Sequence, residues 1–231
     1  MQGLSSILGD RIAVAHADPH AYVTSPFEVE QRHVAHARDI RRREFFAGRA
    51  CARAAMGTLG LPPMAVPVAP DRAPVWPESL VGSISHCETL CIAAVARADD
   101  GYRSIGLDIE PAEALPEDIL DTVCTDAEMD WLERQPDARR GLLARLIFSA
   151  KECAYKCQYP LTRQLIDFHA FEIGVHEETF TATFTASVGE FQSGDRLTGR
   201  FLLSNGYIVC AMALEHGAPR QRHAPELSEC A

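Results

Sequence analysis

Long apolar runs are missing from this 231-residue sequence, and nowhere do the roughly 18 consecutive apolar residues occur that a membrane-spanning helix requires. Residues 1–16 also lack a basic stretch followed by a long apolar core, so we expect no secretory signal. The eight cysteines include no Cys-x₂-Cys pair, the spacing typical of zinc sites. We therefore expect a cytoplasmic protein with no membrane span, whose thiols are reduced and buried.

Positive charge is in short supply, since 22 Lys and Arg stand against 32 Asp and Glu, for a net charge of −10. A chain with this balance should not bind nucleic acid non-specifically, because that binding depends on an excess of basic groups. Arginine is nevertheless concentrated in one segment, at Arg38, Arg41, Arg42, Arg43, Arg49 and Arg53. Two interpretations remain open: a solvated helix face, or a set of guanidinium groups that bind phosphate.

Hydrophobic residues make up 47% of the chain, which is enough for a core and excludes global disorder. Apolar spacing predicts helices over residues 41–59 and 138–158, the second closed by Pro160. Strands are predicted over residues 11–17, 81–86, 90–97, 104–110, 170–175, 179–186, 196–203 and 206–214. Asn205-Gly206 is the turn chemistry of a tight hairpin between the last two.

A helix followed by strands thus occurs twice along the chain, with a break near residues 99–103. This order favours an α+β fold made of two halves over a parallel α/β fold. We expect an N-terminal half over residues 1–103, a C-terminal half over 104–215, and a flexible polar tail over 216–231.

Two carboxylates are spaced so that they share one face of a predicted strand. Asp108 and Glu110 are two residues apart, and alternate side chains of a strand point the same way. Adjacent carboxylates repel each other unless a cation lies between them, and hard cations prefer oxygen ligands. Taken alone, the pair could equally be a strand end with solvated acids.

The second long helix carries a single polar line on an otherwise apolar surface. Arg145, Ser149, Glu152 and Lys156 fall on one stripe, with leucine, isoleucine and alanine on both sides of it. A buried line of charge must be paired or bound to a ligand. Glu152 and Lys156 could instead form an ordinary surface pair one helical turn apart.

Five segments, in this order, resemble the 4′-phosphopantetheinyl transferases, and the likeness extends from about Arg41 to Phe171. They are residues 41–53, Trp76-Pro77, Gly82–His86, Gly106–Glu110 and Phe148–Lys156. The bacterial siderophore and broad-range secondary-metabolism type is the most similar. The resemblance implies two similar halves that form a pseudo-dimer, with the active site in the cleft between them. It also implies transfer of the 4′-phosphopantetheine of coenzyme A to a serine of a carrier protein, with release of 3′,5′-ADP.

The resemblance also assigns roles to individual residues. Asp108, Glu110 and Glu152 would hold Mg²⁺, or Mn²⁺ in its place, and Asp108 would thereby also belong to the coenzyme site. The coenzyme A nucleotide phosphates would be contacted by Arg41, Arg49, Arg53 and Arg72. Its 3′-phosphate region would be contacted by Ser85 and His86. Its diphosphate would be lined by Lys151 and Lys156. Glu152 is the candidate for the general base, directly or through a metal-bound water, and the sequence does not separate this role from that of a metal ligand. Lys156 would neutralise charge on the reacting phosphate.

The expected partner is an apo acyl or peptidyl carrier protein, and the expected state is a monomer. Tyr159, Leu161 and Arg163 could contact the carrier, or they could cover the end of the helix. Two other functions remain open on the residues alone. One is a Mg²⁺-dependent nucleotide phosphodiesterase. The other is a non-catalytic module that binds carrier proteins, which should have lost at least one of the three carboxylates.

Overall fold

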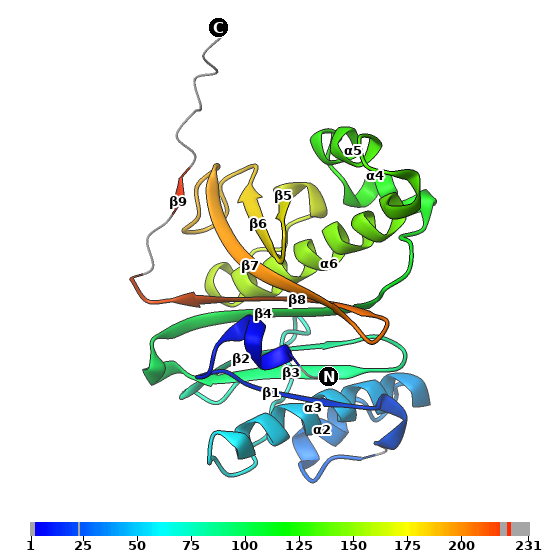
Figure 1. Cartoon of the computed structure of the whole chain (residues 1–231). Coiled ribbons are helices and arrows are strands. Elements are labelled where there is room, and N and C mark those ends of the chain that lie inside the picture. The colour runs from blue at the N-terminus through cyan, green and yellow to red at the C-terminus, as the bar shows by residue number, and fades with distance from the viewer. Residues whose placement is uncertain (1–2, 23, 218–220, 223–231) are drawn as a thin grey trace, which may run out of the picture.

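The computed structural model describes residues 3–22, 24–217 and 221–222, and its elements form two antiparallel sheets, each covered by a long helix (Figure 1). This arrangement confirms the α+β class. No helix in the described part of the chain is long and apolar enough to cross a membrane.

The N-terminal half is a three-stranded sheet, in the order β1-β3-β2, with one long helix on its face. Its elements are α1 (Leu4–Leu8), β1 (Ala13–Ala17), α2 (Glu28–His33), α3 (Asp39–Thr58), β2 (Leu80–His86) and β3 (Cys91–Arg97). The inner face of α3 presents small buried residues, such as Ala47, Ala52 and Ala55, to the sheet. Small side chains let the helix approach the strands closely, so α3 positions the arginines of its first turns beside β2.

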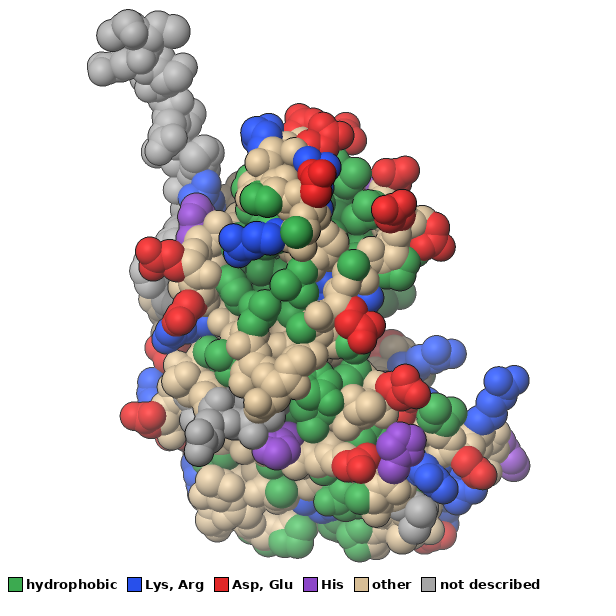
Figure 2. Space-filling view, turned by 45° about the vertical axis from the view of Figure 1, so that its right-hand side comes forward, with side chains coloured by type: hydrophobic (Ala, Val, Ile, Leu, Met, Phe, Trp, Pro, Cys, Tyr) green, Lys and Arg blue, Asp and Glu red, His purple; other side chains and the backbone are tan. Residues whose placement is uncertain are grey.

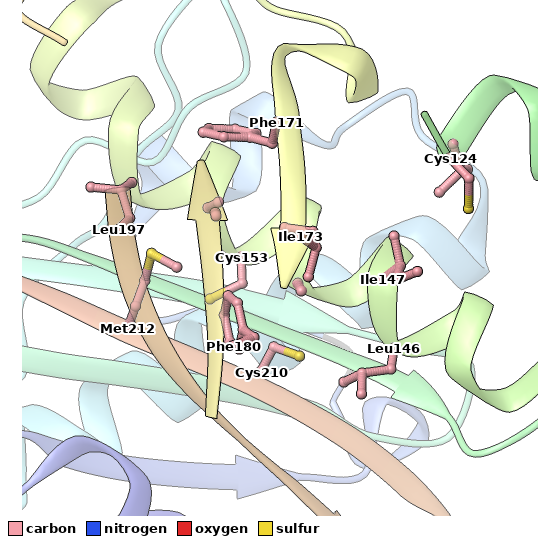
Figure 3. Close-up of a cluster of buried hydrophobic side chains, with 14 of the residues drawn as sticks. Cys124, Leu146, Ile147, Cys153, Phe171, Ile173, Phe180, Leu197, Cys210 and Met212 are labelled. Atoms are coloured by element: carbon pink, nitrogen blue, oxygen red, sulfur yellow. The ribbon is translucent and has the colours of Figure 1, made fainter. Parts of the chain in front are cut away.

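The C-terminal half is a larger sheet, in the order β4-β8-β7-β6-β5, and it is covered by the 26-residue helix α6. Its elements are β4 (Tyr102–Pro111), α4 (Leu120–Val123), α5 (Asp126–Glu133), α6 (Asp137–Thr162), β5 (Phe171–His176), β6 (Thr179–Phe184), β7 (Asp195–Ser204), β8 (Tyr207–Glu215) and β9 (Gln221–Arg222). Figure 3 shows Ile147 and Cys153 of α6 beside Phe180 and Cys210 of the sheet.

The two halves share one connectivity. Apart from the short strand β9, which pairs with β7, the first strand of each half pairs with the last, the last pairs with the one before it, and a long helix follows the first strand. The pairings are β1-β3-β2 in one half and β4-β8-β7 in the other, where β5 and β6 are additions. This shared order favours the two-half architecture expected from the sequence.

Two serine side chains join the halves where β2 runs beside β4. Ser83 Oγ accepts a hydrogen bond from the backbone N–H of Leu107 (3.1 Å), and Ser85 Oγ accepts one from Ile109 (3.3 Å). A buried apolar cluster that includes Ile92 packs under the same junction and contains residues from both halves. The catalytic candidates of both halves are therefore held in one rigid neighbourhood.

Helix α6 ends later than the sequence predicts, and the predicted tail is described only in part. The expectation that Pro160 closes the second helix is wrong, because α6 continues to Thr162. Proline lacks one N–H but has a φ suited to a helix, and the helix ends when Arg163 adopts a left-handed φ of 55°. The predicted tail lies mostly outside the described residues, although the backbone of residues 221–222 pairs with β7.

Candidate active site

A cavity of about 510 Å³ lies between the two halves. One wall comes from the start of α3, the loop over residues 71–76 and strand β2, and the other from the start of β4 and the last turns of α6. Its polar and charged lining residues are Arg41, Glu44, Arg49, Asp71, Arg72, Ser83, His86, Arg103, Ser104, Tyr155, Lys156, Tyr159 and Arg163. An acidic chain has thus gathered several of its basic groups around one cavity, which suits an anionic ligand.

Asp108 is the buried centre of the polar network behind this cavity. The residue is only 3% exposed, and its side chain accepts three hydrogen bonds, from Lys156 Nζ (2.6 Å), Ser85 Oγ (2.9 Å) and Ser149 Oγ (2.8 Å). Lys156 Nζ also donates to Ser85 Oγ at 3.0 Å. Burial alone would lower the pKa of Lys156, but Asp108 and Glu152 outweigh burial and raise it. Lys156 therefore remains charged at the inner end of the cavity.

Glu110 lies beyond Asp108 on β4 and is held by Arg145 of α6, whose Nη1 donates to Glu110 Oε2 at 2.9 Å. Burial, and then the charge of Asp108, raise the pKa of Glu110 to about 7, although Arg145 opposes the shift. The predicted polar stripe of α6 is confirmed at three of its positions, because Arg145, Ser149 and Lys156 each contact one of these two carboxylates.

Glu152 completes the acidic group. Its pKa is raised by burial first and by Asp108 next, while Lys156 lowers it. In the described part of the chain no three His, Cys, Asp or Glu side chains gather tightly enough to form a ready metal site. The donor set still suits Mg²⁺, because Asp108 raises the pKa of both neighbouring carboxylates and a cation would relieve that repulsion.

The arginine cluster divides into groups that face the cavity and groups that hold the fold. Arg41 lines the cavity, and its Nη1 lies 2.9 Å from His86 Nε2. Arg49 also lines the cavity, but it is mostly buried, stacks over Phe45 and donates to the Val66 carbonyl at 3.1 Å. Burial lowers the pKa of Arg49 to about 10, so it stays protonated at neutral pH. Figure 2 shows basic side chains projecting at the lower right of this face, with acidic ones among and above them.

Arg53 does not face the cavity, which corrects its assignment to the nucleotide phosphates. Its Nη1 donates to both carboxylate oxygens of Glu30, at 3.1 and 2.9 Å, and Glu30 is fully buried. Glu30 also accepts a hydrogen bond from the backbone N–H of Val66 at 2.8 Å. A buried carboxylate needs such a partner, so Arg53 stabilises the packing of α2 on α3.

Lys151 also needs correction, because the structure places it away from the cavity that Lys156 lines. It is 1% exposed, and its Nζ donates to Glu128 Oε2 (2.6 Å) and to the Val123 carbonyl (2.7 Å). Glu128 belongs to the capping box of α5 and also accepts from the Ile173 N–H at 2.7 Å. Lys151 therefore fastens α5 to α6, and its ammonium group is buried away from the cavity.

The remaining predicted residues lie at or near the cavity. His86 lines it, and burial is the main cause that lowers its pKa. Arg72 lines it from an exposed turn, with a φ of 71° that is unusual outside glycine. Ser85 is buried behind the cavity, where it joins Lys156 to Asp108.

Sequence reasoning gave no coenzyme role to several lining residues. Tyr159 is buried, and its hydroxyl donates to Asp71 Oδ2 at 2.6 Å, so it is not presented to a carrier protein. Arg163 lies 3.6 Å from the same carboxylate. Arg103 lines the cavity and pairs with Glu190. Only the tertiary fold brings these groups together, because Asp71 and Tyr159 are 88 residues apart in the sequence.

The site has the features of an enzyme that handles phosphates. A cavity lined by basic groups lies between the two halves, and Lys156 at its inner end contacts a group of carboxylates. Comparisons with known proteins identify the class further. Residues 29–96 match the 4′-phosphopantetheinyl transferase N-terminal domain, and residues 104–206 match the 4′-phosphopantetheinyl transferase superfamily.

Similar curated proteins agree with these matches. The chain is 41% identical to 4′-phosphopantetheinyl transferase Svp of Streptomyces mobaraensis, over 84% of each chain. It is 37% identical to Npt of Nocardia iowensis, over 80% of this chain and 87% of that one. It is 33% identical to PptT of Mycobacterium tuberculosis, over 87% and 91%. The chain belongs to the 4′-phosphopantetheinyl transferase superfamily, and its activity is phosphopantetheinyl transfer.

Proposed function

We propose that the cavity between the halves binds coenzyme A and that the Asp108–Lys156 end of it is where the phosphopantetheine moves to a carrier serine. The N-terminal half, residues 1–103, would contact the nucleotide, and the C-terminal half, 104–215, would supply the metal ligands and the catalytic helix. The observation that carries this assignment is the position of Lys156. It lines a cavity rich in arginine and also contacts Asp108 at 2.6 Å.

Arg41, Arg72 and His86 are the proposed contacts for the anionic nucleotide. Arg41 and His86 lie side by side at the cavity wall, 2.9 Å apart, so one phosphate can accept hydrogen bonds from both. Arg49 would contribute charge from behind Phe45 and fix the wall by its bond to the Val66 carbonyl. These contacts serve binding, because they lie on the side of the cavity formed by α3 and β2.

Lys156 and Glu152 are the proposed catalytic residues. The carrier serine hydroxyl would give its proton to the Glu152 carboxylate, while the serine oxygen forms a bond to the phosphorus that carries the pantetheine. The bond from that phosphorus to the bridging oxygen breaks, and 3′,5′-ADP leaves with the electron pair. Lys156 would neutralise negative charge on the phosphate oxygens. The raised pKa of Glu152 suits a base, because it strengthens the carboxylate as a proton acceptor.

Asp108, Glu110 and Glu152 would hold a divalent cation, Mg²⁺ or Mn²⁺. When bound, the cation would neutralise part of the diphosphate charge. Ser149 and Lys156 donate hydrogen bonds to Asp108, and Arg145 donates one to Glu110, which orients both carboxylates. Because both walls of the cavity come from one chain, the site needs no second copy, which supports the proposed monomer. The cytoplasmic location stays a prediction.

Transfer itself is tested by intact-mass spectrometry of an apo carrier protein incubated with coenzyme A, Mg²⁺ and this chain. We expect each carrier to gain one phosphopantetheine, no gain when a chelator replaces Mg²⁺, and a much slower gain with Lys156→Met. A carrier that stays unmodified while 3′,5′-ADP is released would favour the phosphodiesterase alternative. A carrier that binds but stays unmodified, with no ADP formed, would favour the non-catalytic alternative.

A further inference from the structure

One hydrogen bond ties the two halves together across the mouth of the cavity. Asp71 lies at the tip of the loop between α3 and β2, and Tyr159 lies near the end of α6. The Tyr159 hydroxyl donates to Asp71 Oδ2 at 2.6 Å, and Arg163 Nη1 lies 3.6 Å from the same oxygen. Arg163 also stacks over the Tyr159 ring, with 5.8 Å between its guanidinium carbon and the ring centre. Asp71 therefore contacts two residues of the opposite half, Tyr159 and Arg163, which also contact each other.

The turn that carries Asp71 is well defined within itself. Ala69 N–H donates to the Ala73 carbonyl and Arg72 N–H donates to the Ala69 carbonyl, both at 2.9 Å. Asp71 Oδ1 accepts from the Ala73 N–H at 3.0 Å. Asp71 thus uses one carboxylate oxygen to shape the turn and the other to hold Tyr159. The turn is a small rigid unit, and its placement relative to α6 depends on what it contacts outside itself.

Arg72 is the residue that this placement affects most. It is exposed, it lines the cavity, and its left-handed φ of 71° persists only where the surrounding structure fixes it. Asp71 and Arg72 are both exposed at the tip, so burial contributes little to holding them. The polar contacts of Asp71 with α6 are therefore in a position to fix the direction in which Arg72 enters the cavity.

We propose that Asp71 is a positioning residue for coenzyme A: by holding Tyr159 and Arg163 it fastens the 69–73 turn to α6 and keeps Arg72 over the nucleotide end of the cavity. This inference rests on the proposed function, in which Arg72 contacts the nucleotide. The contact has a second effect, because Tyr159 and Arg163 compensate the negative charge of Asp71 beside a site for an anion. The hydrogen bond from Tyr159 also lowers the pKa of Asp71, so the carboxylate stays ionised at neutral pH.

The direct test removes the Tyr159 hydroxyl, which donates the hydrogen bond to Asp71. Tyr159→Phe keeps the ring and deletes the hydroxyl, so we expect the coenzyme A KM to rise about tenfold, the usual size for a lost bond to a charged group. We expect kcat to change less than about twofold and the carrier KM to stay the same, because Tyr159 does not touch the reacting groups. An unchanged coenzyme A KM overturns the proposal, and so does an equal fall in kcat.

A matched control deletes another tyrosine hydroxyl that also joins the halves. The Tyr207 hydroxyl is hydrogen-bonded to Thr89 at 2.8 Å, and neither residue lines the cavity. Tyr207→Phe should leave the coenzyme A KM unchanged. A rise equal to that of Tyr159→Phe would mean that loosening the halves in general is responsible, and it would overturn the specific role of Asp71.

Two variants of Asp71 separate the effect of the Tyr159 hydrogen bond from the effect of the negative charge. Asp71→Asn and Asp71→Ala both remove the negative charge, but only asparagine keeps an oxygen that can accept from Tyr159. We expect the coenzyme A KM of Asp71→Ala to exceed that of Asp71→Asn about fivefold or more. Equal values overturn the proposal. This ratio also provides the test if Tyr159→Phe does not fold.

The link to Arg72 is tested by a double-mutant cycle. Arg72→Ala alone should raise the coenzyme A KM, and adding Tyr159→Phe to it should raise the KM by less than about twofold further, because the tether acts through a group already removed. Independent, multiplying effects overturn the proposal. Failure here is distinguishable from failure of the proposed function: in the first case the wild type still modifies the carrier, whereas in the second it does not.

Discussion

Lys156 Nζ lies 2.6 Å from Asp108 Oδ1, and this contact connects the cavity to the buried carboxylates of β4. Lys156 is the lining residue that belongs to both regions, since it also faces the arginine-rich wall. The side chain of Asp108 is 4% exposed and that of Lys156 is 27% exposed, so the lysine reaches outwards from a buried anchor. The pair orients the ammonium group before any substrate binds.

Replacing Lys156 should therefore affect turnover more than binding. Lys156→Met removes charge that is needed most as the phosphate oxygens become more negative, so we expect kcat to fall about 100- to 1,000-fold. The KM for coenzyme A should change much less, because the arginines bind the nucleotide. Steady-state kinetics with each substrate varied in turn measure both effects. A large rise in the coenzyme A KM at normal kcat would show that Lys156 serves binding alone.

The carboxylates should make the metal-free protein sensitive to pH. The pKa of Glu110 is raised from 4.5 to about 7, so the folded state holds this proton more tightly than the unfolded chain does. The stabilisation is fully present below about pH 4.5 and is lost as the pH rises through 7. The shift corresponds to at most about 3 kcal/mol, and solvent screening reduces it to about 1–2 kcal/mol.

The measurement is the melting temperature without metal between about pH 5 and pH 8, which should fall as the pH rises. Glu110→Gln should flatten this fall, whereas Glu113→Gln, an exposed neighbour, should not. Mg²⁺ should raise the melting temperature most at the high end of the range, because it competes with protons for the same oxygens. If the melting temperature of Glu110→Gln falls with pH as steeply as that of the wild type, Glu110 is not the group responsible.

Two arginines of the same helix should behave in opposite ways. Arg41→Ala should raise the coenzyme A KM about tenfold with little change in melting temperature, because Arg41 is half exposed at the cavity wall. Arg53→Ala should instead lower the free energy of unfolding by about 3–5 kcal/mol, because it leaves the buried Glu30 without its counter-charge. Kinetics and thermal unfolding of both variants give the comparison. A KM effect in a fully stable Arg53→Ala would restore its assignment to the nucleotide.

The buried Lys151–Glu128 pair should prove structural. Lys151→Met should lower the free energy of unfolding by about 3–5 kcal/mol, and adding Glu128→Gln should recover part of the loss. The exposed pair Arg32–Glu28 is the control, where Arg32→Met should cost less than about 1 kcal/mol. Urea unfolding measures these differences. A stable Lys151→Met that has lost transfer would show that Lys151 does serve the diphosphate.

The sequence predicted those parts of the site that are local in the chain. Asp108 and Glu110 are related by strand alternation, and Ser149 and Lys156 by the helix repeat, so one face of one element contains each pair. The same repeat turns Lys151 about 100° away from Glu152, which already indicated that it points elsewhere. The prediction that Lys151 lines the diphosphate together with Lys156 rests on the family resemblance and not on helix geometry.

The parts that failed, or were missed, depend on contacts between distant segments. Arg53 and Arg49 are four residues apart on α3, and only the position of the buried Glu30 decides that Arg53 is structural. Asp71 and Tyr159 are 88 positions apart, so no local pattern in the sequence predicts their contact. The end of α6 was misplaced because proline near the last turn of a helix removes one hydrogen bond without stopping the chain from remaining helical.

The most direct test of the central claim is a crystal structure of this protein with coenzyme A and Mn²⁺, with the ion located by its anomalous scattering. We expect the nucleotide in the cavity between the halves, with phosphates on Arg41, His86 and Arg72. The ion should lie on oxygens of Asp108, Glu110 and Glu152, with Lys156 on the diphosphate. A nucleotide bound outside this cavity, or an ion held by none of these carboxylates, would contradict this claim.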